Sequence, residues 1–408
     1  MLRRLLTAAC LLLSSGGGAL ALPGASDPSV VVGVIATLTG PGAVVGQDVV
    51  DGFNLGLKEL GGRFSNQEVR VVLLDDKGSP DVARQQVARL LERERLDVVL
   101  TAVSAPSLAA VVKPLTSARL FVLNLDQMPD ALAGAECSPW LFSLAPPVDG
   151  VHEALGQHLV NEKVRRVVVV APPYVPSDPA VAALRHTFPG EVVAVLTPKP
   201  GAATFAVELE QIAAFRPDAV YSLLTGGMGG GFIRAWGAWE HKAEIPLYPL
   251  GGAMERPFLP AMGDSAQDVA TIGTWSPDQD TPSNRRFVND FDVEYGRQAT
   301  TWAAQGFDAA FLLDSALKGT SGRTGDPDAV RAALRRAEFA STRGGFKFNT
   351  NHTPVLSYML RKVGRDAKGR AIQESRAVVL RDWRDRRAAA CPMHWVEEVL
   401  PLTSPKKP

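Results

Sequence analysis

The chain has little cysteine, little histidine and no surplus of charge of either sign. Its 408 residues include 3 cysteines and 6 histidines, and 43 basic residues balance 43 acidic ones. Both signs are mixed along the chain, which argues against nucleic acid or an anionic membrane as the partner. The histidines are scattered and the cysteine spacing matches no metal site, so we expect neither a metal nor a cofactor.

Long hydrophobic runs are also missing. The stretch from Leu5 to Leu13 is too short to cross a bilayer, and no later stretch is long enough. It follows Arg3 and Arg4 and precedes Ala19-Leu20-Ala21, the three parts of a secretory signal. We therefore predict that residues 1–21 are a cleaved signal peptide and that a soluble mature chain is exported to the periplasm.

Export changes the interpretation of the cysteines. Cys10 lies inside the predicted signal, which leaves Cys137 and Cys391 in the mature chain. An even number of cysteines in an oxidising compartment favours a disulfide between them. The alternative is two separate buried thiols.

Catalytic motifs are absent as well. The sequence has no G-x-S-x-G elbow and no H-E-x-x-H. Asp75 and Asp76 follow one another at the end of a predicted strand, where helix capping or solvation explains them. We therefore expect a binding protein rather than an enzyme, and a hydrolase would have to be demonstrated by turnover of esters or amides.

Short apolar runs alternate with helical patterns along most of the chain. The runs are apolar at nearly every position, as expected of parallel strands buried on both faces. This alternation predicts an α/β fold with doubly wound sheets. The first series of strands is predicted at 30–36, 69–75, 97–103 and 120–125, and the second at 165–171, 191–196, 218–224, 245–250 and 269–275.

Two breaks divide this pattern. The proline-rich stretch 138–150 is predicted to be a linker, and SPDQDTPSN at 276–284 is the second break. Helices are then expected near 283–295, 300–317 and 327–337, followed by strands at GGFKFN and PVLSYMLRKV. A chain of this length suits two lobes. Ligands bind beyond the carboxyl ends of parallel strands, so two facing edges would form a cleft that closes by hinge motion.

Two glycine-rich joints and two aromatic residues are candidates for the cleft. TLTGPGAVVGQ at 37–47 joins a strand to a helix, where an anion is favoured, although a plain tight turn explains it as well. GGMGGG, which starts at Gly226, fits neither a dinucleotide fingerprint nor a P-loop but suits backbone approach to a small ligand. Tyr174 could close over a ligand, and Trp275 could stack on it.

These features together resemble a known family, the type I periplasmic binding proteins of ABC transporters, in the branched-chain amino-acid (leucine-isoleucine-valine) group. The likeness covers about residues 29–363 and is carried by VGVIATLTGPGAVVGQDVVDGFNLGLKELGG, VVLLDDKGSPDVARQQVARLL, RPDAVYSLLTGG and AAQGFDAAFLLDSALK. It implies two Rossmann-like lobes joined by three crossovers, near 145–150, 272–277 and 348–354. It also implies a monomer that delivers its ligand to membrane permease subunits.

The resemblance implies a domain layout, and it implies that the end of the ligand site that binds the carboxylate is retained. The expected lobes are 22–146 with 275–348 and 147–274 with 349–387, followed by a tail at 388–408. Ser104 matches the serine whose hydroxyl and N–H hold the ligand carboxylate, and Leu125 matches a backbone contact. Gln127 stands where a hydroxyl-bearing residue is usual, so the carboxylate end of the site looks kept.

The opposite end of the site departs from the family pattern. Val45 and Thr225 stand where the family has tyrosines, and Gly251 stands where a glutamate pairs with the ligand's ammonium. An ammonium enclosed without a partner charge is costly, so we expect an aromatic or otherwise bulky apolar carboxylate. Glu136-Cys137-Ser138-Pro139, the GFDAA segment and Cys391 resemble the aromatic-carboxylate branch of the family.

Two alternatives remain open at this point. Glu255 could replace the missing acid and restore branched-chain amino-acid binding. The same bilobal fold also serves ligand-sensing modules that act through a signalling partner. Neighbouring genes for permease and ATPase subunits would distinguish transport from sensing.

Overall fold

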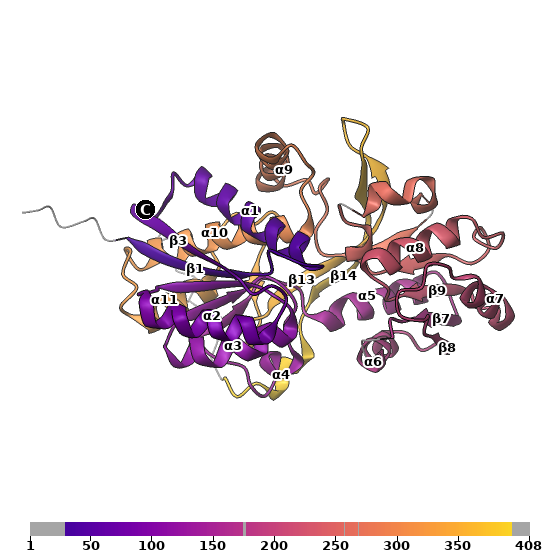
Figure 1. Cartoon of the computed structure of the whole chain (residues 1–408), viewed down its shortest axis with the longest axis horizontal. Helices are drawn as coiled ribbons and strands as arrows, with labels where there is room; N and C mark the ends of the chain where they lie inside the picture. The colour runs from indigo at the N-terminus through magenta and orange to yellow at the C-terminus, as the bar shows by residue number, and fades with distance from the viewer. Residues whose placement is uncertain (1–28, 174–176, 257, 268, 394–408) are drawn as a thin grey trace, which may run out of the picture.

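The computed structural model describes residues 29–173, 177–256, 258–267 and 269–393. The predicted signal peptide and Tyr174 lie outside these ranges. Within them the chain forms two α/β bodies, which lie side by side in Figure 1 and are called lobe 1 and lobe 2 below. No helix in the described ranges is long and apolar enough to cross a membrane.

Lobe 1 is built on a six-stranded sheet in the order β2-β3-β1-β4-β5-β6. Every neighbouring pair is parallel except β2 with β3. Val32 lies at the centre, paired with Val71 on one side and Val98 on the other. The strands are β1 (Val30–Ala36), β2 (Arg63–Phe64), β3 (Gln67–Asp75), β4 (Val98–Ala102), β5 (Phe121–Asn124) and β6 (Leu141–Ser143).

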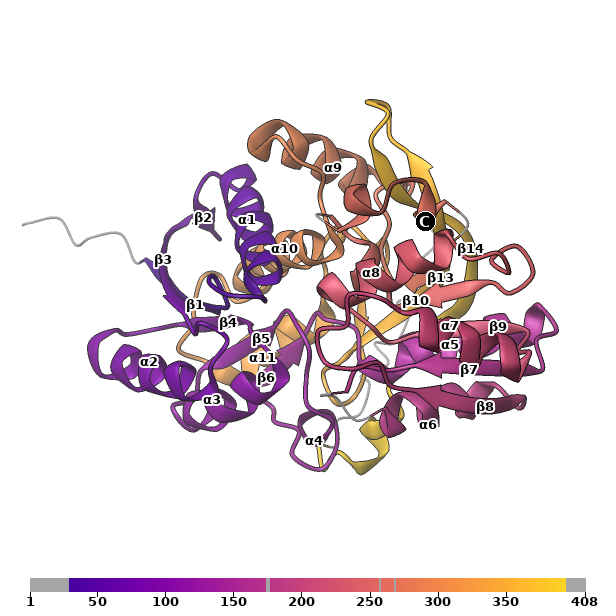
Figure 2. The same ribbon diagram turned by 45° about the vertical axis from the view of Figure 1, so that its right-hand side comes forward.

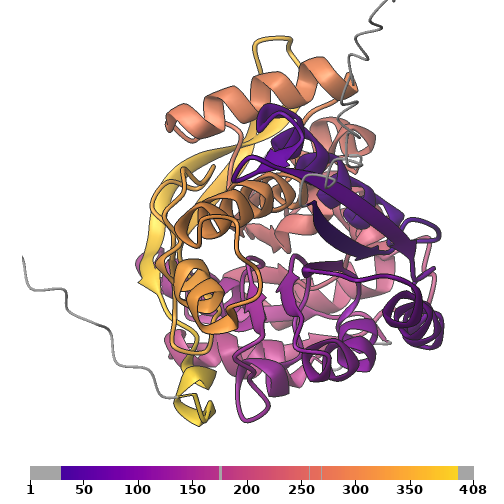
Figure 3. The same cartoon turned by 90° about the vertical axis from the view of Figure 1, so that its left-hand side faces the viewer.

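Helices cover both faces of this sheet because β1 is apolar at every position. Val30, Val32 and Val34 pack against α1, α10 and α11, whereas Val31 and Ile35 pack against α2 and α3. Figure 2 shows α1 and α10 on one side of the sheet and α2 and α3 on the other, and Figure 3 faces this lobe. The helices are α1 (Ala43–Glu59), α2 (Pro80–Arg93), α3 (Ala105–Ser117), the short α4 (Asp130–Ala133), α9 (Pro282–Tyr295), α10 (Thr301–Gly319) and α11 (Pro327–Arg336).

Helices α1 and α10 approach each other closely through glycines. A Cβ at Gly52 would overlap the carbonyl oxygen of Ala303, and one at Gly306 would overlap that of Val49. Any other residue would therefore force the helices apart. Through this contact α10, which comes late in the chain, packs on lobe 1, as the sequence pattern predicts.

Lobe 2 combines a parallel sheet with a long antiparallel hairpin. The parallel sheet has the order β10-β9-β7-β8, and β13 pairs with β11, β12 and β14 in antiparallel fashion. Helices α5 and α6 cover one face, and α7 and α8 the other. The elements are α5 (Val148–Asn161), β7 (Arg166–Val170), α6 (Asp178–Thr187), β8 (Glu191–Leu196), α7 (Ala206–Phe215), β9 (Ala219–Ser222), α8 (Gly226–Gly237), β10 (Leu247–Pro249), η1 (Gly251–Met254), η2 (Leu259–Ala266), β11 (Ala270–Gly273), β13 (Pro354–Arg365), β14 (Ala371–Trp383) and η3 (Arg386–Ala390). Strand β12 (Lys347–Phe348) pairs with the start of β13 but packs in the core of lobe 1.

The two-lobe α/β fold is confirmed, but the sequence analysis missed three strands, β6, β14 and the two-residue β2. The predicted linker at 138–150 contains β6, which completes the lobe 1 sheet, and the start of α5. A strand of three residues next to prolines is too short to show a period. Strand β14 pairs with β13 alone and carries many exposed charged residues, so its sequence lacks the apolar run of a buried strand.

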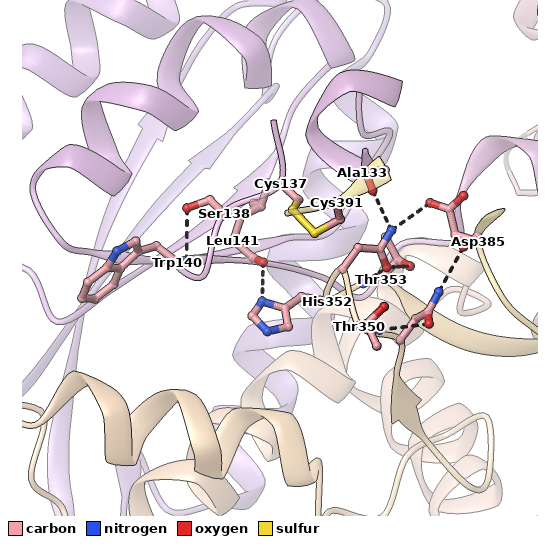
Figure 4. The surroundings of a disulfide bond; sticks show 12 residues. Ala133, Cys137, Ser138, Trp140, Leu141, Thr350, His352, Thr353, Asp385 and Cys391 are labelled. Carbon is pink, nitrogen blue, oxygen red and sulfur yellow. Dashed lines mark hydrogen bonds between the residues drawn. A yellow bond between two sulfur atoms is a disulfide. The ribbon is translucent and has the colours of Figure 1, made fainter. Parts of the chain in front are cut away.

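The chain passes between the lobes between β6 and α5, between β11 and α9, and between β12 and β13. The C-terminal segment adds a covalent tie. Cys137 and Cys391 form the predicted disulfide, with their Cα atoms 5.6 Å apart (Figure 4). Beside it, Arg387 forms ion pairs with Asp130 of lobe 1 at 2.6 Å and with Asp149 of lobe 2 at 2.7 Å. The tail therefore bridges both lobes.

Candidate ligand-binding cleft

A cleft of about 860 Å³ lies between the lobes, within the usual size range of small-molecule sites. Both walls are formed mainly by segments that follow strands, together with the first turn of α10 and part of β13. The wall from lobe 1 consists of Pro41, Val45, Asp126, Gln127, Ala145, Pro146, Thr301, Trp302 and Gln305. The wall from lobe 2 includes Val148, Val151, His152, Thr225, Gly226, Met228, Leu250, Gly251, Glu255, Phe258, Ile272, Tyr358 and Arg361.

The glycine-rich loop after β1 is held in place from the end of β3. The hydroxyl of Thr37 donates to Asp76 at 2.7 Å, and the N–H of Leu38 donates to Asp75 at 2.9 Å. Gly40 adopts a φ of +84°, which disfavours a residue with a side chain. These contacts place Pro41 and Val45, at the start of α1, in the wall of the cleft. The two aspartates therefore position the loop.

The start of α8 opens on the other wall. Thr225 is the N-cap residue, but its exposed side chain makes no capping hydrogen bond. Gly226 has a φ of +56°, and a Cβ at Gly226 or Gly227 would meet no atom within 4 Å. The first backbone N–H groups of the helix are thus available to a ligand, as the sequence pattern GGMGGG suggested.

Arg361 of β13 lies against Gly251, where the family pattern has an acid. Its side chain is 3% exposed, and Nη1 donates to Glu255 and to the carbonyl oxygen of Trp275, both at 3.1 Å. A side chain at Gly251 or Gly273 would overlap this guanidinium. The lobe 2 wall therefore presents the ion pair of Arg361 and Glu255 at the place where the family pattern puts an acid alone.

Glu255, the possible replacement acid, is already engaged. Its Oε1 accepts hydrogen bonds from Arg361 and, at 2.8 Å, from the hydroxyl of Thr301. Thr301 belongs to lobe 1, so this bond joins the two lobes. The next residue, Arg256, forms a second interlobe link to Asp48 at 2.7 Å. Residues 255 and 256 therefore fasten lobe 2 to the starts of α1 and α10.

Asp126 is the carboxyl group in the cleft that lacks a cationic partner among the described residues. It is the second residue after β5 and is half-buried. Burial raises its pKa to about 7, and a hydrogen bond from the backbone of Gln127 opposes this shift. The group therefore changes charge near neutral pH, within the cleft.

The remaining polar side chains of the cleft are neutral near pH 7. His152 bonds to the hydroxyl of Tyr221 at 2.5 Å, and burial lowers the pKa of this histidine to about 4. Burial raises the pKa of Tyr358, whose hydroxyl donates to the carbonyl oxygen of Pro147 at 3.4 Å. The Oε1 atom of Gln305 is buried without a hydrogen-bond partner in the described part of the chain. It can accept a hydrogen bond from a ligand.

Five of the residues singled out in the sequence lie together in the cleft. They are Val45, Gln127, Thr225, Gly226 and Gly251. Tyr174 lies outside the described residues.

Three others lie away from the cleft surface. Ser104 caps α3, and its Oγ accepts from the N–H of Ser107 at 3.4 Å. The side chain of Leu125 is in the core, and its N–H is bonded to Thr101. Trp275, expected to stack on a ligand, packs with Phe287 and donates to Asn284 at 2.7 Å. It is a core residue because its crossover runs beneath α9.

Sequence reasoning missed Arg361, Asp126 and Trp302. A lone arginine in the apolar run PVLSYMLRKV was one signal, because a charge within a buried strand requires a partner. Asp126, just after a buried strand, was a second. Trp302, in the first turn of α10, gave no signal that separates it from a packing residue.

Comparison with known proteins gives a consistent picture. The model of the periplasmic binding protein family matches residues 29–370. A Leu/Ile/Val-binding protein homolog 6 from Brucella abortus (strain 2308) is 23% identical over 323 residues, covering 77% of this chain and 82% of its own length. Two solved structures are each 26% identical to this chain, and each match covers 88% of it.

One of these structures is an ABC transporter solute-binding protein from R. palustris in complex with benzoate, with a TM-score of 0.78 and 99% of its chain covered. The other is an ABC transporter substrate-binding protein from Sphaerobacter thermophilus, with a TM-score of 0.82 and 100% covered. The family match spans most of the sequence, both lobes and the cleft between them. The chain belongs to the periplasmic binding protein family.

Proposed function

We propose that this protein is the extracytoplasmic solute-binding component of an ABC importer and that its ligand is a small aromatic or bulky apolar carboxylate. The ligand class is inferred from one observation above all, the guanidinium of Arg361 beside Gly251. An α-ammonium group placed there would meet this cation, which already pairs with the nearby acid Glu255. The relative from R. palustris, crystallised with benzoate, supports the same class of ligand.

The lining of the cleft suits a ring. Val45, Pro146 and Trp302 line the cleft on lobe 1, and Met228 and Ile272 line it on lobe 2. Apolar walls with a few polar groups are the usual composition of small-molecule sites. An aromatic ring would bury its surface against these walls while its carboxylate meets one of the charged groups.

The proposal also covers how the protein acts in transport: it would be exported and would deliver its ligand to permease subunits. Residues 1–21 would direct the chain to the periplasm and be removed there. The mature protein would act as a monomer, with lobe 1 at 22–146 and 275–348 and lobe 2 at 147–274 and 349–387. The related solute-binding proteins of ABC transporters support a transport role over catalysis.

A second candidate is binding of a branched-chain amino acid with a rearranged ammonium site. The carboxyl of Asp126, which has no cationic partner among the described residues, favours it, because this group could pair with an ammonium from the lobe 1 side. Thermal unfolding with leucine, valine, phenylalanine, benzoate and cinnamate distinguishes the two candidates. A ligand at a hundred times its Kd stabilises the folded state by about 2.7 kcal/mol. A melting shift with leucine or valine and none with the aromatic acids would overturn the proposed ligand class.

A further inference from the structure

We propose that the ligand's carboxylate is bound on lobe 2 by the guanidinium of Arg361, at the place where the family resemblance implies an ammonium-binding acid. The carboxylate of the ligand would then point to lobe 2, whereas the sequence pattern implies that it points to lobe 1. This inference rests on the proposed function and names the group that recognises the carboxylate.

Two glycines create the space for the guanidinium. Arg361 pairs with Thr271 of β11, and Gly273 lies two residues farther along that strand, on the same face. A Cβ at Gly273, or at Gly251 in η1, would overlap atoms of the guanidinium. The absence of side chains at both positions is therefore what allows a cation to line the cleft here.

The guanidinium retains unused hydrogen-bond donors. Nη1 is occupied by Glu255 and by the carbonyl oxygen of Trp275. Nε is buried and has no partner in the described ranges, and Nη2 donates to no described residue. Buried donors without partners are rare and costly. Nε is closed off from the cleft by Gly273, whose Cβ would overlap it, so Nη2 is the donor that a carboxylate entering the cleft can reach.

Glu255 orients the arginine through Nη1 alone. Oε1 of Glu255 also accepts from Thr301 at 2.8 Å and from Gln373 at 3.5 Å. These neutral donors hold the carboxylate in place, and the carboxylate holds the guanidinium. The donor Nη2 is thereby left for an anion that enters the cleft.

The opposite wall is unsuited to an anion. Asp126 and Gln127 line the cleft on lobe 1, and no described cation pairs with this aspartate. Ser104, the expected carboxylate ligand, uses its hydroxyl to cap α3 and does not line the cleft. A carboxylate at this end would lie near another carboxyl group, whereas at the lobe 2 end it would meet the guanidinium.

The experiment compares benzoate with benzamide, a neutral analogue of the same shape, by isothermal titration calorimetry. The wild-type protein is expected to prefer benzoate by about ten- to a hundred-fold, the usual value of a hydrogen bond to a charged group. The double variant Arg361→Met/Glu255→Gln removes both charges together, so that neither is left buried alone. It should bind the two ligands nearly equally, with little change in the Kd of benzamide.

Two single variants serve as matched tests. Glu255→Gln removes the counter-charge but keeps an acceptor for Thr301, so it should bind benzoate more tightly than the wild type does. Ser104→Ala should leave the preference for benzoate unchanged. Should the double variant fail to fold, Ser104→Ala still decides, because a carboxylate placed on lobe 1 predicts that this variant loses the preference for benzoate.

The inference and the proposed function fail in different ways. A wild-type protein that binds leucine and neither benzoate nor benzamide overturns the proposed function, and the inference with it. A wild-type protein that prefers benzoate, with the preference retained in the double variant and lost in Ser104→Ala, overturns the placement on Arg361 alone.

Discussion

The guanidinium of Arg361 fills the space in which a side chain at Gly251 would lie. The two residues come from segments more than a hundred positions apart, β13 and η1, and they meet in the wall of the interlobe cleft. Position 251 therefore cannot change without moving the arginine. The ligand chemistry of the cleft follows from this pair.

Replacing Gly251 by alanine should weaken benzoate binding by about tenfold or more. The added Cβ would overlap Nη2 of Arg361, and the guanidinium has little room to move because its Nη1 is bonded to Glu255 and to the carbonyl oxygen of Trp275. Titration calorimetry measures the loss. Gly252→Ala is the matched control, because its Cβ would meet only Trp302, at 3.6 Å, and affinity should stay within about twofold. Equal effects of the two variants would contradict this account of Gly251.

The affinity for benzoate should rise as the pH falls from 8 to 6. Asp126 has a pKa of about 7, so it is largely ionised at pH 8 and repels an anion, but largely neutral at pH 6. Binding coupled to the uptake of one proton changes affinity by at most tenfold per pH unit, and by less near the pKa. Affinity should follow the neutral fraction of Asp126, so we expect a rise of about tenfold from pH 8 to pH 6. His152, with a pKa of about 4, stays neutral throughout.

The same titration with Asp126→Asn should give an affinity that does not change between pH 8 and 6. A ligand whose ammonium pairs with Asp126 would show the opposite slope in the wild type, with tighter binding at higher pH. A wild-type slope of that sign, measured with leucine, would support the amino-acid alternative.

Features that depend on residues close together in the sequence could be predicted, and features that depend on residues far apart in the sequence could not. The strands at 30–36 and 191–196 were predicted to the residue, because their apolar runs and bounding turns are local signals. Strands β6 and β14 were missed because their partners, β5 and β13, supply the hydrogen bonds that define them.

The site shows the same limit. Val45, Thr225 and Gly251 could be placed in the cleft by their position after strands. The meeting of Arg361 with Gly251 could not, because it depends on the pairing of β13 with β11. Trp275 illustrates the reverse error, since a crossover residue can face the core as readily as the cleft.

Loss of the ion pair between Arg256 and Asp48 should favour separation of the lobes. Asp48 keeps Arg297 and Thr300 as partners in lobe 1, so Arg256→Ala removes an interlobe contact without leaving a buried charge alone. A loss of about 1 kcal/mol for a partly exposed pair lowers ligand affinity about fivefold. Small-angle scattering should show a larger radius of gyration for the unliganded variant.

The control for this variant is Arg285→Ala. Arg285 pairs with Asp280 on the exposed surface of lobe 1 and contacts no residue of lobe 2 among the described pairs. Its loss should change neither affinity nor radius. An Arg256→Ala protein that matches this control would contradict the role of the interlobe ion pair.

The disulfide between Cys137 and Cys391 should stabilise the protein substantially. It closes a loop with a sequence separation of 254 residues, for which the chain-entropy model gives about 5 kcal/mol as an upper value. Cys137→Ser/Cys391→Ser should therefore melt at a clearly lower temperature than the wild type. Intact-mass analysis after alkylation of the denatured mature chain should add no group without reductant and two groups after reduction. Two added groups without reductant would rule out the bond.

The most direct test of the central claim is a crystal structure of the wild-type protein with benzoate. We expect the ring between Val45, Trp302 and Met228, and the carboxylate within hydrogen-bonding distance of Nη2 of Arg361. A carboxylate bound instead by Ser104 and the backbone near Gln127, with Arg361 free of the ligand, would contradict the account.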